Sequence, residues 1–274
     1  MKKSSFIEGT IIATVSIIIV KILGMLYVIP FYALIGVEGA ALYAYAYNIY
    51  VIFLDISSAG LPIAISKVIN EFNTLGKMDA KVRAYRIGKQ LITFLSIVVF
   101  VLLFLFAPVI SNLLLGDMQG GSSLSDVTFV IRAVSFAILV IPYLSVSKGY
   151  LQGHNIVNVS SMSQLIEQVV RILFVLGGSY ITLRILHLSL STAVGVAVFG
   201  AFAGGIAAIL YLMKKMRVHR NELHLVKNLK RDSISNRSIV KKIISYAVPF
   251  IIIDIAVSIY NFIDMIFLLI TQII

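Results

Sequence analysis

Long apolar stretches separated by short polar connections dominate the chain. Each stretch is long enough to cross a hydrocarbon layer of about 30 Å, which takes about 20 helical residues. The stretches cover approximately residues 7–35, 42–66, 90–115, 127–147, 159–183, 191–213 and 243–274. Their apolar residues are continuous and do not alternate with a period of two, which argues against transmembrane β-strands. The pattern predicts an all-α membrane protein, a polytopic bundle of about seven transmembrane helices.

The first apolar stretch is longer than the apolar core of a signal peptide, and no small-residue cleavage site follows it. Gly24 and Pro30 interrupt an otherwise unbroken span. We therefore expect residues 7–35 to be retained as the first transmembrane helix.

Composition supports the membrane class. Hydrophobic residues make up 59% of the chain and charged residues 13%, against about 45–50% and about 25% in soluble domains. Cysteine is absent, so disulfides, thiolate metal sites and a cysteine nucleophile are excluded. The residues form no nucleophile–base pair, metal-ligand cluster or phosphate-binding loop, and His219 and His224 are spaced wrongly for two ligands on one helical face. We expect no enzyme activity, no metal and no cofactor.

The net charge of +11 reflects topology, and we expect no nucleic-acid partner, because the basic residues lie between the apolar stretches. If the N-terminus is cytoplasmic, most of the 23 lysines and arginines fall in cytoplasmic segments. Cytoplasmic loops of membrane proteins carry such an excess. The sequence therefore predicts a cytoplasmic N-terminus.

The longest connection, residues 214–242, is strongly basic and divides the chain. We expect a six-helix lobe over 1–213, a basic cytoplasmic linker over 214–242, and the first helix of a second lobe over 243–274. The spacing of Met216, Leu223, Val226 and Leu229 is consistent with an amphipathic helix on the anionic inner leaflet. A solvated linker is the alternative.

Ionisable side chains inside the spans are candidates for function, because charge is costly in hydrocarbon. Lys21 lies too deep in the first span to reach the inner surface easily, and a deep lysine favours an anionic cargo such as a phosphate. The alternative is a structural ion pair between Lys21 and Asp55, which lies near the middle of the second span.

The other candidates lie in later spans. Glu167 and Arg171 are four residues apart, a spacing that permits an ion pair on one helix, with either a structural or a substrate role. Asp254 and Asp264 in the last span are expected to face a second lobe or a cavity. Gly200 and Gly204 form a GxxxG pattern in the sixth span, which predicts close helix packing.

Three segments carry a family resemblance. They are VKILGMLYVIPFYALIGVEGAALYAYAYNIYVIFLDISSAGLPIAISKVINEFN (20–73), KGYLQGHNIVNVSSMSQLIEQVVRILF (148–174) and SYAVPFIIIDIAVSIYNFID (245–264). They resemble flippases of the stage V sporulation protein B type and the lipid II flippases, which belong to the multidrug/oligosaccharidyl-lipid/polysaccharide exporter superfamily. The matches are spread over essentially the whole chain.

The resemblance implies two six-helix lobes around a cavity that opens to each side of the bacterial cell membrane in turn. It implies an undecaprenyl-diphosphate-linked glycan, such as lipid II, as cargo. Lipid II flippases have a cavity-lining basic residue in an SRxLG motif, and the matching VKILG assigns that role to Lys21. Where some members have arginine near the end of helix two, this chain has Leu54 and Asp55.

Family members are roughly twice as long as this chain, which resembles their first half. The second lobe is expected from a longer protein or from a separate partner chain. Two other functions are weighed against the flippase. A multidrug/cation antiporter of the same superfamily is disfavoured because, past Glu8, the first span has no carboxylate. The second alternative function is that of a membrane protein that transports nothing and instead acts as a partner of cell-wall enzymes.

The charge distribution leads to a prediction of topology. Single cysteines introduced at Asn73 and Asn228 should be protected from a membrane-impermeant thiol reagent in intact cells, whereas a cysteine at Ser122 should react. Labelling at Asn228 without labelling at Ser122 would reverse the orientation.

Overall fold

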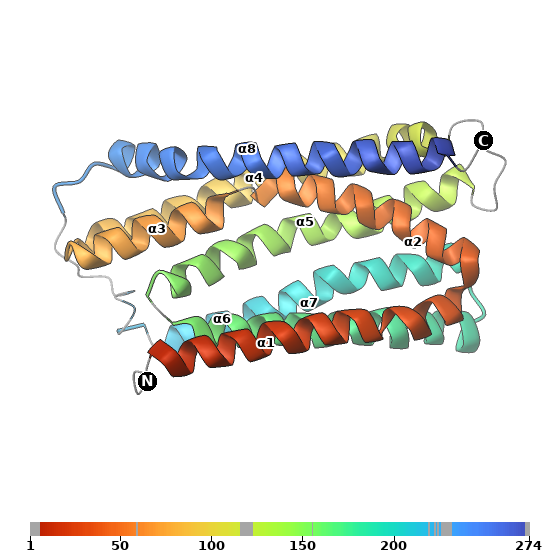
Figure 1. Cartoon of the computed structure of the whole chain (residues 1–274), viewed down its shortest axis with the longest axis horizontal. Coiled ribbons are helices and arrows are strands. Elements are labelled where there is room, and N and C mark those ends of the chain that lie inside the picture. Colours follow the sequence, from red (N-terminus) through yellow and green to blue (C-terminus); the bar gives the residue numbers. More distant parts are fainter. Residues whose placement is uncertain are drawn as a thin grey trace.

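The computed structural model describes residues 6–58, 60–115, 123–154, 156–218 and 232–271, with Arg220, Asn221, Leu223 and Leu225. Over these residues the chain is helical without strands, and the helices run lengthwise through an elongated bundle (Figure 1). The helices are α1 (Phe6–Leu26), α2 (Val28–Ser58), α3 (Leu61–Thr74), α4 (Met78–Leu115), α5 (Leu124–Gln152), α6 (Val157–Ile172), η1 (Leu173–Gly178), η2 (Ile181–Ile185), α7 (Leu190–Val218) and α8 (Asn236–Thr271). The predicted all-α polytopic fold is confirmed.

The first two predicted spans meet at Gly36. This residue interrupts α2 with a φ of 69°, a conformation that glycine adopts without steric cost. Figure 1 shows the chain running along α1 to one end of the bundle and returning along α2. Residues 28–35 therefore prolong the first crossing, and residues 37–58 begin the second.

A second glycine separates α2 from α3. Gly60 has a φ of 64°, and Pro62 lies in the first turn of α3. A Cβ atom at Gly60 would lie 2.6 Å from the Cβ of Phe250 and 2.8 Å from the carbonyl oxygen of Ala247. Glycine is therefore required here twice, for its backbone conformation and for the close approach of α8.

The fifth crossing is longer than one α-helix. It starts as α6 and continues through the short π-helical segments η1 and η2. The sixth crossing, α7, continues to Val218, and α8 begins at Asn236, seven residues before the predicted start at residue 243. Of the predicted interfacial helix, Met216 belongs to α7, Leu223 lies in a turn, and Val226 and Leu229 lie outside the described residues.

Helix α5 lies at the centre of the bundle and packs against α2, α3, α4 and α7. Its apolar side chains join two buried clusters. One contains Ile131 and Ile138 together with residues of α2 and α7. The other contains Leu144 and Tyr150 together with residues of α3, α4 and α8. Most of the remaining helix surface is apolar and exposed, as expected of a protein surrounded by lipid.

The basic connections lie at one end of the bundle. The α3–α4 turn, the end of α7, the start of α8 and the start of α1 share that end (Figure 1). The helices therefore group the basic residues of these segments at one end of the bundle, as the predicted topology requires. Which side is cytoplasmic stays a prediction.

The expected close packing at the GxxxG pattern is confirmed. A Cβ atom at Gly200 would lie 3.0 Å from the carbonyl oxygen of Arg171, and one at Gly204 would lie 2.5 Å from that of Glu167. Helix α7 therefore presses its backbone against the turn of α6 that carries both charged residues. Close backbone approach through small residues is a main source of helix association in lipid.

Gly204→Ala should destabilise the protein by about 1–3 kcal/mol, because the new methyl group meets backbone atoms that cannot rotate away. The thermal unfolding midpoint of the detergent-purified chain should fall by several degrees. Gly177→Ala is the matched control, since a Cβ atom there has nothing within 4 Å. Equal midpoints for the two variants would contradict this description of the α6–α7 contact.

Candidate functional site

Lys21 lies on α1, about three quarters of the way along that helix, and its side chain is exposed. It makes no hydrogen bond or ion pair to any residue that the structure describes. The alternative interpretation, a structural pair with Asp55, is therefore not what the structure shows. Helix α1 packs mainly on α6, and one turn after Lys21 the backbone at Gly24 approaches the amide of Gln168.

The two candidate carboxylates of α2 and α8 lie close to the α2–α3 break. Asp55 is half-buried in the last turn of α2, with a polar partner of its own. Asp254 accepts a hydrogen bond from the backbone N–H of Gly60 at 3.1 Å. Asp254 therefore binds the first lobe directly, in contrast to the expectation that it faces a second lobe or a cavity. The Asp264 backbone belongs to α8, and its side chain lies outside the described part of the structure.

Glu167 and Arg171 form the expected ion pair, with 3.8 Å between Glu167 Oε1 and Arg171 Nη2. Glu167 makes a shorter contact with Lys148, a residue that lies just after the predicted span 127–147. Lys148 Nζ donates to Glu167 Oε2 at 2.9 Å. Each of the three side chains is less than one fifth exposed. One carboxylate therefore lies between two cations from α5 and α6, and this triad carries a net positive charge.

Tyrosines of α2 surround the guanidinium of Arg171. Tyr43, Tyr47 and Tyr50 follow one another along α2 with ring centroids 5.7 Å and 5.9 Å apart, and all three are electrostatic neighbours of Arg171. The Nε of Arg171 and the hydroxyl oxygen of Tyr50 are buried without a hydrogen-bond partner among the described residues. The Tyr50 hydroxyl and the Arg171 guanidinium are nevertheless electrostatic neighbours of each other, so together they form a polar interior between α2 and α6.

The sequence-predicted residues thus fall into separate places. Glu167 and Arg171 come together inside the bundle, whereas Lys21 lies on the outer face of α1 and Asp55 at the end of α2. Lys148 was missed because its apolar stretch seemed to end at residue 147, while α5 continues to Gln152. No local spacing signals this contact, because Glu167 lies in the second half of α6, nineteen residues after Lys148.

In the part of the chain that the structure describes, no group of three histidine, aspartate or glutamate side chains is arranged to hold an ion. The site contains fixed charges and hydroxyl groups.

The chain matches the family described as "Polysaccharide biosynthesis protein" over residues 6–272. It belongs to this family. Over 264 residues it is 33% identical to Lipid II flippase MurJ of Bacillus subtilis, covering 95% of this chain and 48% of that protein. It is 30% identical to Stage V sporulation protein B of the same organism, over 84% of this chain and 44% of that protein.

A solved structure shows the same fold. The transporter of the MOP superfamily from Pyrococcus furiosus superimposes with a TM-score of 0.69 at 16% identity, over 93% of this chain and 54% of that chain. The chain spans about half the length of the relatives that it matches. The family member described here is a multi-pass membrane protein, and the resemblance to the N-terminal half of flippases of this superfamily is confirmed.

Glu167→Gln should destabilise the bundle by about 3 kcal/mol, because it leaves two half-buried cations without their carboxylate. The thermal unfolding midpoint of the purified chain reports the loss. Glu38→Gln is the control, since Glu38 is exposed near the Gly36 reversal. Adding Lys148→Gln to Glu167→Gln should restore part of the stability. A double variant no more stable than Glu167→Gln would contradict the triad.

Proposed function

We propose that the chain forms the N-terminal lobe of a flippase. Its cargo would be an undecaprenyl-diphosphate-linked glycan precursor, lipid II or a polysaccharide unit, carried across the bacterial cytoplasmic membrane for cell-wall or polysaccharide synthesis. The observation that carries this proposal is Lys21, an exposed lysine without a partner among the described residues, deep in an apolar helix. The name of one Bacillus relative, Lipid II flippase MurJ, supports the same cargo class.

A charge in this position is costly unless something neutralises it. A lysine in the middle of a membrane span costs about 2.5–3.5 kcal/mol on insertion scales. A diphosphate is a suitable counter-charge, and an ammonium group binds it as a point charge from several directions. The cost that Lys21 imposes on the empty lobe is thus offset when the head group is bound.

Transport requires a second wall for the cavity that holds the cargo. In our proposal a second lobe, in the same protein or in a partner chain, completes the cavity, while the prenyl tail stays in the lipid between helices. Rocking of the two lobes exposes the head group to each side in turn. With the N-terminus in the cytoplasm, an inside-negative potential favours outward movement of an anion by about 2.3 kcal/mol per charge per 100 mV.

The remaining site residues take supporting roles in the proposal. The net positive triad around Glu167, with Arg171 beside the tyrosines of α2, attracts and orients polar groups of the glycan or diphosphate. Asp55 and Asp264 lie on α2 and α8, the helices between which a second lobe would meet the first. Their charges would restrict where an anionic head group can rest.

Lys21→Ala should abolish transport with little change in the amount of folded protein, whereas Lys21→Arg should keep much of the activity because it keeps the charge. Transport is measured by rescue of a flippase-depleted Bacillus strain. The protein used joins residues 1–274 to the unmatched half of the Bacillus lipid II flippase. Residues 1–274 alone should fail to rescue, since one lobe closes no cavity.

Binding gives a second readout that does not depend on the joined protein. The purified chain should retain lipid II in native mass spectrometry, and Lys21→Ala should weaken that binding while the neighbouring change Ile22→Ala does not. Equal lipid II binding by the wild type and Lys21→Ala would remove the cargo role. Increased resistance to cationic drugs, in place of rescue, would favour the antiporter.

A further inference from the structure

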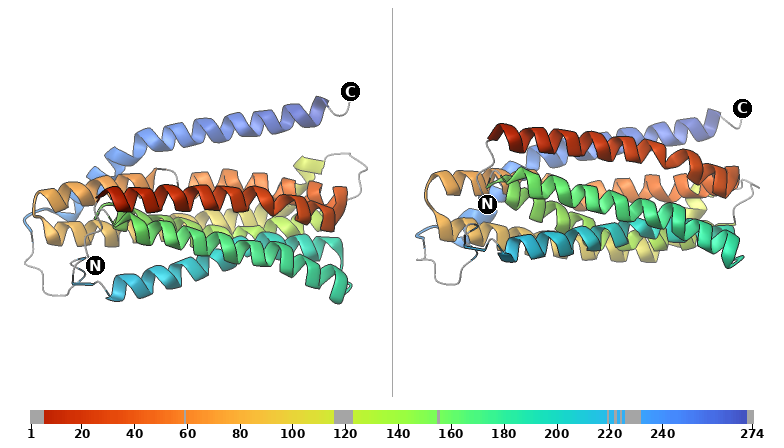
Figure 2. Two further views of the ribbon diagram at one scale, coloured as in Figure 1. Left: turned by 60° about the horizontal axis from the view of Figure 1, so that its bottom comes forward. Right: turned by 90° about the horizontal axis from the view of Figure 1, so that it is seen from below.

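A cavity of about 580 Å³ opens between α4, α5 and α7. It lies at the end of the bundle that holds the basic connections, near the start of α4 and the last turn of α7 (Figure 1). Figure 2 shows α7 on the side of the bundle opposite α1 and α8. The cavity is therefore separate from the face of α1 that carries Lys21.

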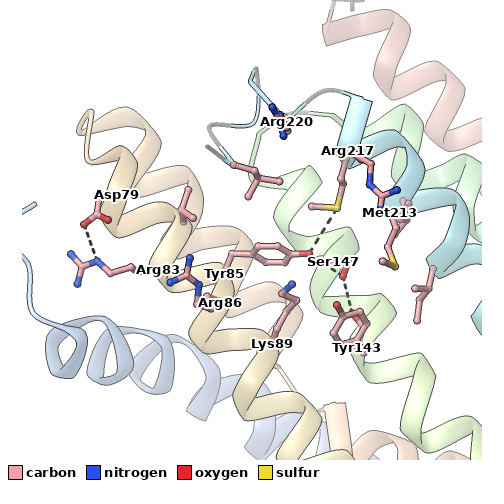
Figure 3. A pocket seen from close by; sticks show the side chains of 15 residues that line it. Asp79, Arg83, Tyr85, Arg86, Lys89, Tyr143, Ser147, Met213, Arg217 and Arg220 are labelled. Atoms are coloured by element: carbon pink, nitrogen blue, oxygen red, sulfur yellow. Dashed lines mark hydrogen bonds and ion pairs between the residues drawn. The ribbon is translucent and has the colours of Figure 1, made fainter. Parts of the chain in front are cut away.

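The charge on the cavity wall is strongly positive. Among the described residues that line it, the one carboxylate is Asp79, which pairs with Arg83 at 2.9 Å. Arg83 also donates to Asn236 Oδ1 at 2.7 Å and to the carbonyl oxygen of Ile234 at 2.8 Å. Figure 3 shows Arg83 turned towards Asp79 and away from the other basic side chains. These two residues neutralise each other and hold the end of the segment that leads into α8.

Four further cations line the same cavity: Arg86, Lys89, Arg217 and Arg220. The side chains of the three arginines make no hydrogen bond or ion pair within the described part of the chain. Lys89 Nζ lies over two aromatic rings, 4.6 Å from the centroid of Tyr85 and 5.7 Å from that of Tyr143. Like charges gathered around one cavity repel unless an anion lies among them.

The floor of the cavity is amphipathic. Tyr85 is buried there, and its hydroxyl donates to Ser147 at 3.2 Å. Ile209, Leu212 and Met213 of α7 add apolar surface beside the charged rim (Figure 3). A ligand that fits both parts has a negatively charged head and an apolar body that continues along the exposed face of α7.

We propose that this cavity binds the phosphate of an anionic phospholipid. The guanidinium groups of Arg86 and Arg217, from opposite walls, would hold the phosphodiester through charge-assisted hydrogen bonds. Lys89 and Arg220 complete the positive field, and the acyl chains lie along α7. Basic pockets between transmembrane helices at the membrane surface bind anionic lipid head groups in this way. The bound lipid links α4 to α7 and does not contact the proposed cargo site at Lys21.

The test measures binding of phosphatidylglycerol to the purified chain in detergent by native mass spectrometry. Arg86→Gln with Arg217→Gln should weaken binding roughly tenfold or more, since loss of two charged contacts removes at least about 1.4 kcal/mol. Lys214→Gln with Lys215→Gln is the control, because it removes the same charge from exposed positions of α7 that do not line the cavity. Lys89→Met is a second, independent cavity variant, and the thermal midpoint of each protein confirms folding.

The outcomes separate the possibilities. Selective loss of phosphatidylglycerol in the two cavity variants, with phosphatidylcholine bound weakly by all proteins, supports the site. Equal loss in the cavity variant and the Lys214/Lys215 control means unspecific attraction to a basic surface and overturns the proposal. Displacement of phosphatidylglycerol by millimolar inorganic phosphate means a site for soluble phosphate and also overturns it. Because the readout is lipid binding, failure of the flippase proposal leaves this result unaffected.

Discussion

Hydrocarbon offers no hydrogen-bond partner, and this constraint governs every polar group of the chain. Each backbone N–H and C=O in the membrane must be satisfied inside the protein, so the crossings are helices. Hydroxyl side chains obey the same rule by donating to their own helix, as Ser111 does to Ala107 at 2.8 Å and Ser145 to Ile141 at 3.0 Å. Where the helix ladder breaks at Gly60, the carboxylate of Asp254 accepts the exposed N–H.

The same constraint distinguishes two kinds of charge in the lobe. Lys148, Glu167 and Arg171 satisfy one another, and α7 approaches their turn of α6 closely because Gly200 and Gly204 present no side chain. Packing and electrostatics thus stabilise the same turn. Lys21 has no such arrangement on α1. An external counter-charge contributes most to binding where the protein itself provides none. We therefore place the proposed cargo contact at Lys21.

The lengths of the apolar stretches predicted the membrane crossings well, because about 20 consecutive apolar residues form a membrane-spanning helix. They also located the first reversal within a few residues, since Gly36 lies between the predicted spans 7–35 and 42–66. Helix ends were less accurate: α5 runs past residue 147 and α8 begins before 243, because polar helical turns project beyond the hydrocarbon and carry no hydropathy signal.

Many side-chain contacts depend on how helices that are distant in sequence pack together. The sequence pattern predicted only contacts between residues of the same helix. The Glu167–Arg171 pair follows from spacing on one helix, whereas the Lys148 contact requires the packing of α5 on α6. The cavity between α4, α5 and α7 was invisible for the same reason: its basic residues appeared only as topology-determining charges. Asp254 was expected to face away from the first lobe, yet it caps the α2–α3 break.

That cap has a mechanical consequence for α8. The first half of α8 is fastened to the lobe by Asp254 at Gly60 and by Lys242 and Tyr246 at Glu71. Beyond Asp254 its apolar residues, such as Ile259 and Tyr260, are exposed, and Figure 2 shows the helix diverging from the bundle towards its C-terminal end. Helix α8 is therefore attached along its first half, and its last attachment, at Asp254, lies near the middle of the helix. In the proposed two-lobe protein, the part of α8 beyond Asp254 would be the part that a second lobe contacts, because its apolar side chains are left exposed.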